Sequence, residues 1–141
     1  MKILVSACLL GLKCRYNGTE KADEEVLKLL EKHILVPFCP EIYGGLATPR
    51  DPAEIRDDRV VTEAGKDVTA EYEKGAQEAL KLAQMMGCDI ALLQDRSPSC
   101  GAGKVHNGLF DGGLVDGDGV TAALFRKNGI KVLPASRASE L

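Results

Sequence analysis

Hydrophobic and polar residues follow two different patterns along the chain. Short runs rich in branched aliphatic residues cover residues 2–7, Ile34 to Phe38, Asp89 to Gln94 and Ile130 to Leu133. Continuous apolar runs of this length are typical of strands that are buried on both faces, as in a parallel sheet. The pattern therefore predicts four buried strands.

Between the second and third runs, apolar residues recur with helical spacing. From Val68 to Met86 they are three or four residues apart, which places them on one face of a helix. Asp67 is the predicted N-cap and Gly87 the residue that ends the helix. Two further helices are predicted, one starting at Asp23-Glu24-Glu25 and one covering Val120 to Asn128.

Strands that alternate with helices predict an α/β fold. We expect one domain over residues 1–141, with a mainly parallel, Rossmann-like sheet flanked by helices, since this length suits a single domain. Residues 40–66 are predicted to be irregular, with one short strand at Arg59–Val61. Residues 97–119 are rich in glycine and are predicted to form a mobile or ligand-binding loop.

Composition limits the functional classes. The net charge of −3 and the pI near 5.4 give no overall attraction to nucleic acid. No apolar run is long enough for a transmembrane helix or a signal peptide, so no membrane partner is expected. Five cysteines without a secretory signal indicate the reducing cytoplasm, where thiols bind metal or take part in chemistry.

Three of the cysteines come shortly after predicted strands, each within a short loop rich in Gly, Pro or Ser: Cys8, Cys39 and Cys100. The loops after parallel strands converge on one crevice, so these thiols are expected to meet there. Three thiolates are one short of the four that usually satisfy zinc or an iron–sulfur cluster, which would leave an open metal position. The alternative is that they are small core residues, and no CxxC spacing decides between the two.

The other two cysteines are interpreted differently. Cys14 is close to Cys8 in sequence and is either a fourth ligand or a spare thiol. Its neighbours Lys13 and Arg15 are expected to lower its pKa. Cys88 lies at the entry of a predicted strand, away from the crevice, and is expected to be structural.

Several polar residues adjoin these cysteines. Glu41 follows Cys39 by two residues, and a carboxyl group in a partly dry cleft can have a raised pKa and donate a proton. Ser97 could relay a proton, although serines before a turn more often bond to the local backbone. Of the two histidines, His106 is a weaker candidate for a functional role, and His33 is weaker still. We assign four residues to substrate binding: Arg50, Ser99, Gly44 and Gly45.

Five motifs, in order along nearly the whole chain, resemble the thiouracil desulfidase family, small bacterial proteins long known only as a domain of unknown function. They are Val5-Ser6-Ala7-Cys8-Leu9-Leu10-Gly11, Cys14-Arg15-Tyr16-Asn17-Gly18, Cys39-Pro40-Glu41 with Gly44-Gly45-Leu46, Thr48-Pro49-Arg50, and Ser97-Pro98-Ser99-Cys100-Gly101. Asn17 stands where the family more often has Asp, and both residues suit a turn.

The resemblance implies a 4Fe–4S cluster bound by Cys8, Cys39 and Cys100, with one iron open to the sulfur of a thiolated pyrimidine such as thiouracil. Coordination of the thiocarbonyl would activate its carbon toward water, without net electron transfer. Glu41 would supply or shuttle the proton and Ser97 would assist. A cluster-delivery protein is an expected partner.

Two other functions remain open. One is an iron–sulfur or sulfur carrier, in which Cys14 completes a set of four thiolate ligands and no desulfidase activity exists. The other is a metal- or nucleotide-sensing module that acts on thiolated tRNA through a partner. The acidic net charge disfavours the second, since binding to a polyanion relies on basic residues.

Overall fold

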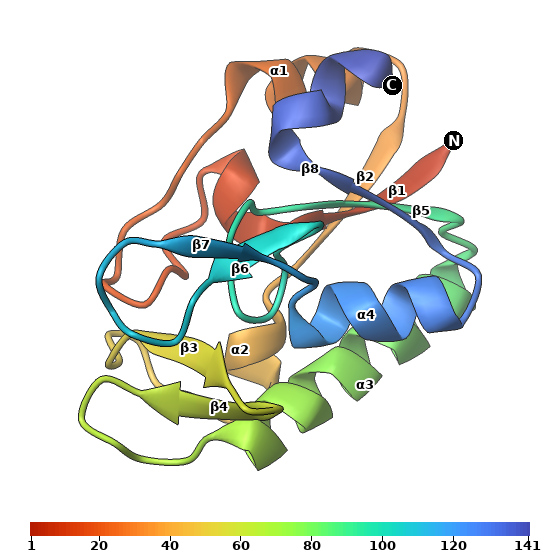
Figure 1. The fold of residues 1–141 in the computed structure, drawn as a ribbon. Helices are drawn as coiled ribbons and strands as arrows, with labels where there is room; N and C mark the ends of the chain where they lie inside the picture. Colours follow the sequence, from red (N-terminus) through yellow and green to blue (C-terminus); the bar gives the residue numbers. More distant parts are fainter.

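A computed structural model describes all 141 residues, with a four-stranded sheet at its centre (Figure 1). The strands are β1 (Lys2–Ser6), β2 (Ile34–Phe38), β5 (Ile90–Leu93) and β8 (Lys131–Pro134). Their order is β2-β1-β5-β8, and every neighbouring pair is parallel. The four predicted strands and the predicted parallel sheet are confirmed, with differences of one residue at some strand ends.

Helical segments cover both faces of this sheet. One face carries α3 (Thr69–Met86) and α4 (Val120–Lys127), which pack against each other (Figure 1). The other carries α1 (Glu24–Lys28) and the 3₁₀ helices η2 (Leu29–Glu31) and η3 (Ala135–Glu140). The flanking helices that the sequence predicts are thereby confirmed.

The central strand β1 shows why its residues are apolar on both sides. Ile3 and Val5 belong to the cluster that includes Val26 of α1, whereas Leu4 belongs to the opposite cluster, with Phe125 of α4. All five side chains are buried almost completely. A strand between two helical layers has no face in contact with water, and a continuous apolar run results.

Helix α3 begins later than predicted. Its N-cap is Val68, and the Asp67 carboxylate accepts the N–H of Thr69 at 2.9 Å from one residue further out. The predicted end is confirmed: Gly87 adopts the left-handed conformation at φ 72°, and its N–H bonds to the carbonyls of the last turn.

Two antiparallel hairpins lie outside the main sheet, and the sequence prediction missed most of both. One pairs β3 (Ala53–Arg56) with β4 (Arg59–Thr62), and the other pairs β6 (Lys104–His106) with β7 (Leu114–Asp116). The region predicted as a glycine-rich loop therefore contains a hairpin. Strands of three or four residues carry too little periodicity to be recognised.

Two short helices complete the fold at the ends of strands. The 3₁₀ helix η1 (Ala7–Leu10) continues directly from β1, and α2 (Pro40–Tyr43) follows β2 after Cys39. Proline at the first position of α2 suits a helix start, because its missing N–H would have no partner there. None of the helices combines the length and the apolar character needed to cross a membrane.

Candidate active site at the carboxyl ends of the strands

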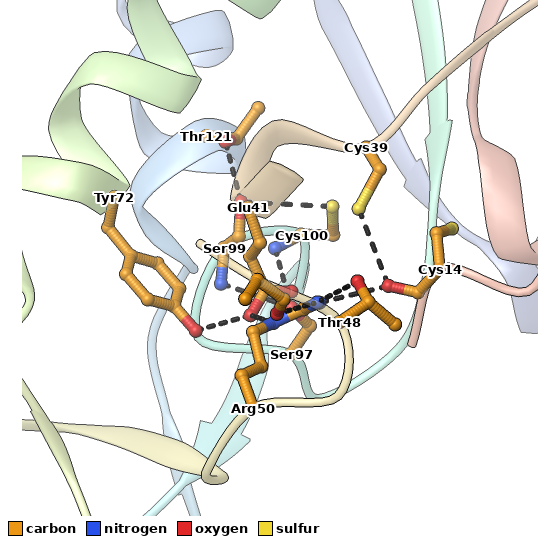
Figure 2. A network of polar contacts seen from close by, with 11 residues as sticks. Cys14, Cys39, Glu41, Thr48, Arg50, Tyr72, Ser97, Ser99, Cys100 and Thr121 are labelled. Carbon is orange, nitrogen blue, oxygen red and sulfur yellow. Dashed lines mark hydrogen bonds and ion pairs between the residues drawn. The ribbon is translucent and has the colours of Figure 1, made fainter. Parts of the chain in front are cut away.

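A cavity of about 330 Å³ lies where β1, β2 and β5 end. Cys8 reaches it from η1, Cys39 from the N-cap of α2, and Cys100 from the loop after β5. Cys14 also lines it, and Figure 2 shows Cys14, Cys39 and Cys100 close together. Cys88 is buried at the opposite end of β5 and takes no part in the cavity.

The thiols of the cavity are near one another. Cys14 is within hydrogen-bonding reach of the Cys39 and Cys8 thiols, and the Cys39 thiol lies 3.8 Å from the Cys14 carbonyl. All five cysteines are free thiols. No three histidine, cysteine or acidic side chains converge on a single metal ion. A 4Fe–4S cluster binds each thiolate through a different iron and therefore needs a wider spacing.

Three of the cavity thiols, those of Cys14, Cys39 and Cys100, have raised pKa values. Burial raises the pKa of Cys100 to about 12, assisted by the charges of Cys39 and Glu41. For Cys14, a hydrogen bond with Cys39 lowers the pKa, but a hydrogen bond with Cys8 and burial raise it to about 11. The expected lowering by Lys13 and Arg15 is therefore wrong, because neither contributes. The contact with Cys14, followed by burial, raises the pKa of Cys39.

Glu41 lies in the first turn of α2 and is held by two side chains (Figure 2). The Tyr72 hydroxyl donates a hydrogen bond to its Oε1, and Arg50 Nε lies 3.5 Å from the same oxygen. Burial, followed by the charge of Glu41, raises the pKa of Tyr72, so the phenol remains a donor. Both contacts use Oε1, and neither uses Oε2.

Tyr72 was missed as a site residue because it belongs to the apolar stripe of α3. Its ring packs in a small cluster with Val60 and Val68, as the stripe predicted. Its hydroxyl, however, extends to Glu41 on another element. The sequence could have indicated this role, because the hydroxyl of a tyrosine in a buried helix face needs a hydrogen-bond partner.

The side chain of Arg50 is occupied by contacts within the protein. Its guanidinium donates to the Cys14 carbonyl at 2.9 Å and to Thr48 Oγ1 at 3.0 Å, in addition to its ion pair with Glu41. The side chain is only 8% exposed and does not line the cavity. Arg50 therefore joins the segments that carry Cys14 and Glu41.

Of the two serines, only Ser97 reaches the cavity. Its Oγ accepts the N–H groups of Ser99 and Cys100, each at 3.0 Å, which leaves its own proton to donate. Ser99 is fully buried and shares a hydrogen bond of 2.8 Å with Thr121. Ser99 does not line the cavity.

The two glycines assigned to substrate binding have structural roles. A Cβ at Gly44 would lie 2.0 Å from the Glu71 carbonyl oxygen, and one at Gly75 would lie 1.9 Å from the Pro40 oxygen. These two positions allow α2 and α3 to touch. Gly45 has a φ of 99°, which suits the turn after α2. Neither Gly44 nor Gly45 lines the cavity.

Other residues of the cavity were not singled out from the sequence. Tyr16, Glu54, Asp95 and Phe110 line it, as does the weaker candidate His106. Asp95 Oδ1 and His106 Nδ1 are buried without a partner in the protein. These residues come from four separate segments, so no spacing in the sequence connects them. His33 lies elsewhere, where its ring contacts the Leu141 carbonyl.

Comparison with known proteins decides the family. The profile of 2-thiouracil desulfurase matches residues 3–136, which is nearly the whole chain. The chain belongs to this family. The resemblance inferred from the five motifs is therefore confirmed.

Two individual proteins are also similar to the chain. The Bacillus subtilis uncharacterized protein YbbK is 41% identical, and the alignment covers 99% of this chain and 99% of that protein. The solved structure of the [4Fe-4S]-dependent thiouracil desulfidase TudS is 47% identical. It superposes with a TM-score of 0.93 over 99% of this chain and 94% of its own. The match confirms the fold.

Proposed function

We propose that this 2-thiouracil desulfurase family member hydrolyses the C=S bond of a thiolated pyrimidine base such as thiouracil, without redox change. The observation that carries the proposal is the convergence of three strand-end thiols, a held carboxylate and a serine hydroxyl on one cavity. The similarity to a [4Fe-4S]-dependent thiouracil desulfidase over 99% of the chain supports the same class of reaction.

The residues present fit a 4Fe–4S cluster. Cys8, Cys39 and Cys100 would hold it, because they come from three different strand ends of a buried pocket and all are free thiols. When bound, the cluster would supply a thiophilic Lewis acid for the thiocarbonyl sulfur. The pKa values of Cys39 and Cys100 are raised, so cluster binding must displace the protons of these two thiols.

Side chains of the protein would carry out the proton transfers. Oε2 of Glu41 would exchange a proton with the reacting groups, while Tyr72 and Arg50 hold Oε1 in place. The Ser97 hydroxyl would donate a hydrogen bond, since its oxygen already accepts two backbone N–H groups. Positioned acid–base groups of this kind typically accelerate a reaction by about 10²–10⁴-fold.

The proposed reaction is balanced without an electron donor or acceptor. The oxygen of water forms a bond with the thiocarbonyl carbon, and the carbon–sulfur bond breaks. Both protons of the water finally reside on the sulfur, so that thiouracil and water give uracil and hydrogen sulfide. Glu41 would return to its starting protonation state after each turnover.

The test is anaerobic reconstitution with iron and sulfide, followed by measurement of sulfide released from 2-thiouracil and from 4-thiouracil. We expect one uracil for each sulfide. Reconstituted protein that contains iron but forms no uracil would disprove the proposal. We further propose that the protein acts in the reducing cytoplasm, where its five thiols stay free, and that a cluster-delivery protein loads it.

One observation favours the carrier as a second candidate. Cys14 lies in the same cavity, within reach of Cys39 and Cys8, so four thiols could bind one cluster. The number of ligands separates the two functions. Mössbauer spectra with one distinct iron site support the enzyme, whereas four equivalent thiolate-bound irons support the carrier.

A further inference from the structure

The loop between β6 and β7 is fixed by two side chains of β3. Oε1 of Glu54 accepts the N–H of Gly108 at 2.9 Å and the N–H of Phe110 at 3.2 Å. Arg56 donates from Nε to the Gly108 carbonyl at 3.0 Å, and its terminal nitrogen donates to the same oxygen. Glu54 is only 8% exposed, so these backbone groups satisfy a buried carboxylate.

The conformation that these contacts hold is unfavourable for the chain. Phe110 has a φ of 55°, a left-handed value that is uncommon for a bulky residue. Gly108 also has a positive φ, and a Cβ there would lie 2.7 Å from the Ile55 carbonyl oxygen. Such outliers persist where the surroundings over-determine them, and they cluster at ligand clamps.

Packing of the protein does not explain this position of Phe110. Its side chain belongs to none of the three apolar clusters of the core. It lines instead the cavity shared by the strand-end cysteines. Tyr16, from a different segment, lines the same cavity, and its ring lies 6.0 Å from the Arg15 guanidinium carbon.

We propose that Phe110 is a specificity-determining residue whose ring stacks on the flat face of the pyrimidine base. Aromatic rings favour offset stacking with planar partners, and a ring held by its backbone loses little freedom when the base binds. Glu54 and Arg56 are positioning residues that act through Phe110. The inference rests on the proposed function, since it names how that substrate is recognised.

The experiment compares Phe110→Leu with Phe110→Tyr in the reconstituted protein. Leucine keeps the apolar volume without a π face, whereas tyrosine keeps the ring. From the usual energy of base–aromatic stacking, we expect Phe110→Leu to raise KM for 2-thiouracil about 5- to 100-fold. The kcat and iron content should stay within about twofold, and Phe110→Tyr should retain the wild-type KM. The control is Leu109→Ala, an exposed neighbour outside the cavity.

A second substrate tests stacking directly. 5,6-Dihydro-2-thiouracil keeps the C=S and N–H groups but lacks the flat ring. The wild type should favour 2-thiouracil, and Phe110→Leu should lose most of this preference. Glu54→Gln should raise KM less than Phe110→Leu and add nothing in the double variant, because it acts through the same residue. An additive effect would disprove the positioning role.

Equilibrium dialysis with radiolabelled uracil provides a readout independent of turnover. Weaker uracil binding by Phe110→Leu supports the inference, even if the wild type releases no sulfide and the proposed function fails. Sulfide release with unchanged KM and unchanged uracil binding in Phe110→Leu would overturn the inference while the proposed function stands. Wild-type protein that neither binds uracil nor releases sulfide would overturn both.

Discussion

The cavity is built from two regions of different construction. On one side are the carboxyl ends of β1, β2 and β5, which belong to a parallel sheet buried on both faces. On the other are the β3–β4 and β6–β7 hairpins, whose strands are short and whose loops are held by polar contacts. The segments that follow the sheet strands carry the cysteines, and the hairpins carry Glu54 and Phe110. The difference indicates that the proposed reactive groups are placed by the ends of the core sheet, and the proposed substrate contact by a hairpin loop that polar contacts hold in place.

The largest effect is expected when one of the thiols at the strand ends is removed. Cys39→Ser should lose most of the cluster iron and all measurable sulfide release, because a serine oxygen is a poor ligand for thiophilic iron. Iron content and cluster absorbance after anaerobic reconstitution are the measurements. Cys88→Ser is the matched control, since Cys88 is buried but remote from the cavity. Equal iron loss in both variants would show that folding, and not ligation, is affected.

The next largest effect separates chemistry from cluster binding on the sheet side. Glu41→Gln keeps the shape of the side chain and removes its titratable proton. We expect turnover to fall by about 10²-fold or more, the usual scale for general acid–base catalysis, with iron content unchanged. Tyr72→Phe removes one hydrogen bond to Glu41 and should have a milder effect.

A control for Tyr72→Phe is available on α2. Tyr43→Phe removes a hydroxyl from an exposed ring that stacks on Phe38, with ring centres 4.5 Å apart. Turnover should not change in this variant. The assignment of Glu41 fails if Glu41→Gln retains full turnover or if its only defect is a lost cluster.

Stability should differ between the two regions as well. Leu92→Ala removes a fully buried side chain of β5 and should lower the free energy of unfolding by about 2–5 kcal/mol. Leu114→Ala in β7, where the side chain is 41% exposed, should change it by less than about 0.5 kcal/mol. Urea denaturation of the cluster-free variants measures both. Similar losses would mean that the hairpins belong to the cooperative core.

The smallest expected effect concerns Cys14. Cys14→Ser should leave the iron content and the cluster absorbance unchanged, because three strand-end thiols suffice for binding. Its hydrogen-bonding reach to Cys39 and Cys8 predicts at most a slower assembly. Iron loss as large as in Cys39→Ser would instead establish four ligands and favour the carrier function.

The sequence was sufficient to predict the strands and the meeting of the cysteines, because both depend on the local apolar pattern and on the topology of a parallel sheet. Continuous apolar runs identify β1, β2, β5 and β8. Parallel strands that end at one edge of the sheet bring Cys8, Cys39 and Cys100 to one cavity. Nothing local reveals that Tyr72 contacts Glu41 or that Glu54 holds Phe110, since these pairs are far apart in the chain. The contacts of Arg50 with Cys14 and Glu41 were not foreseen for the same reason, because the folding of distant loops sets these partners.

The close contact between α2 and α3 has a mechanical consequence. Pro40 and Gly75 meet at one point and Gly44 and Glu71 at another, with no room for a Cβ at either glycine. The four-residue helix α2 thus contacts α3 at two points. Since Cys39 and Glu41 are only two residues apart on this short segment, any shift of α2 moves both together. The packing of α2 against α3 therefore sets the backbone positions of both residues at once.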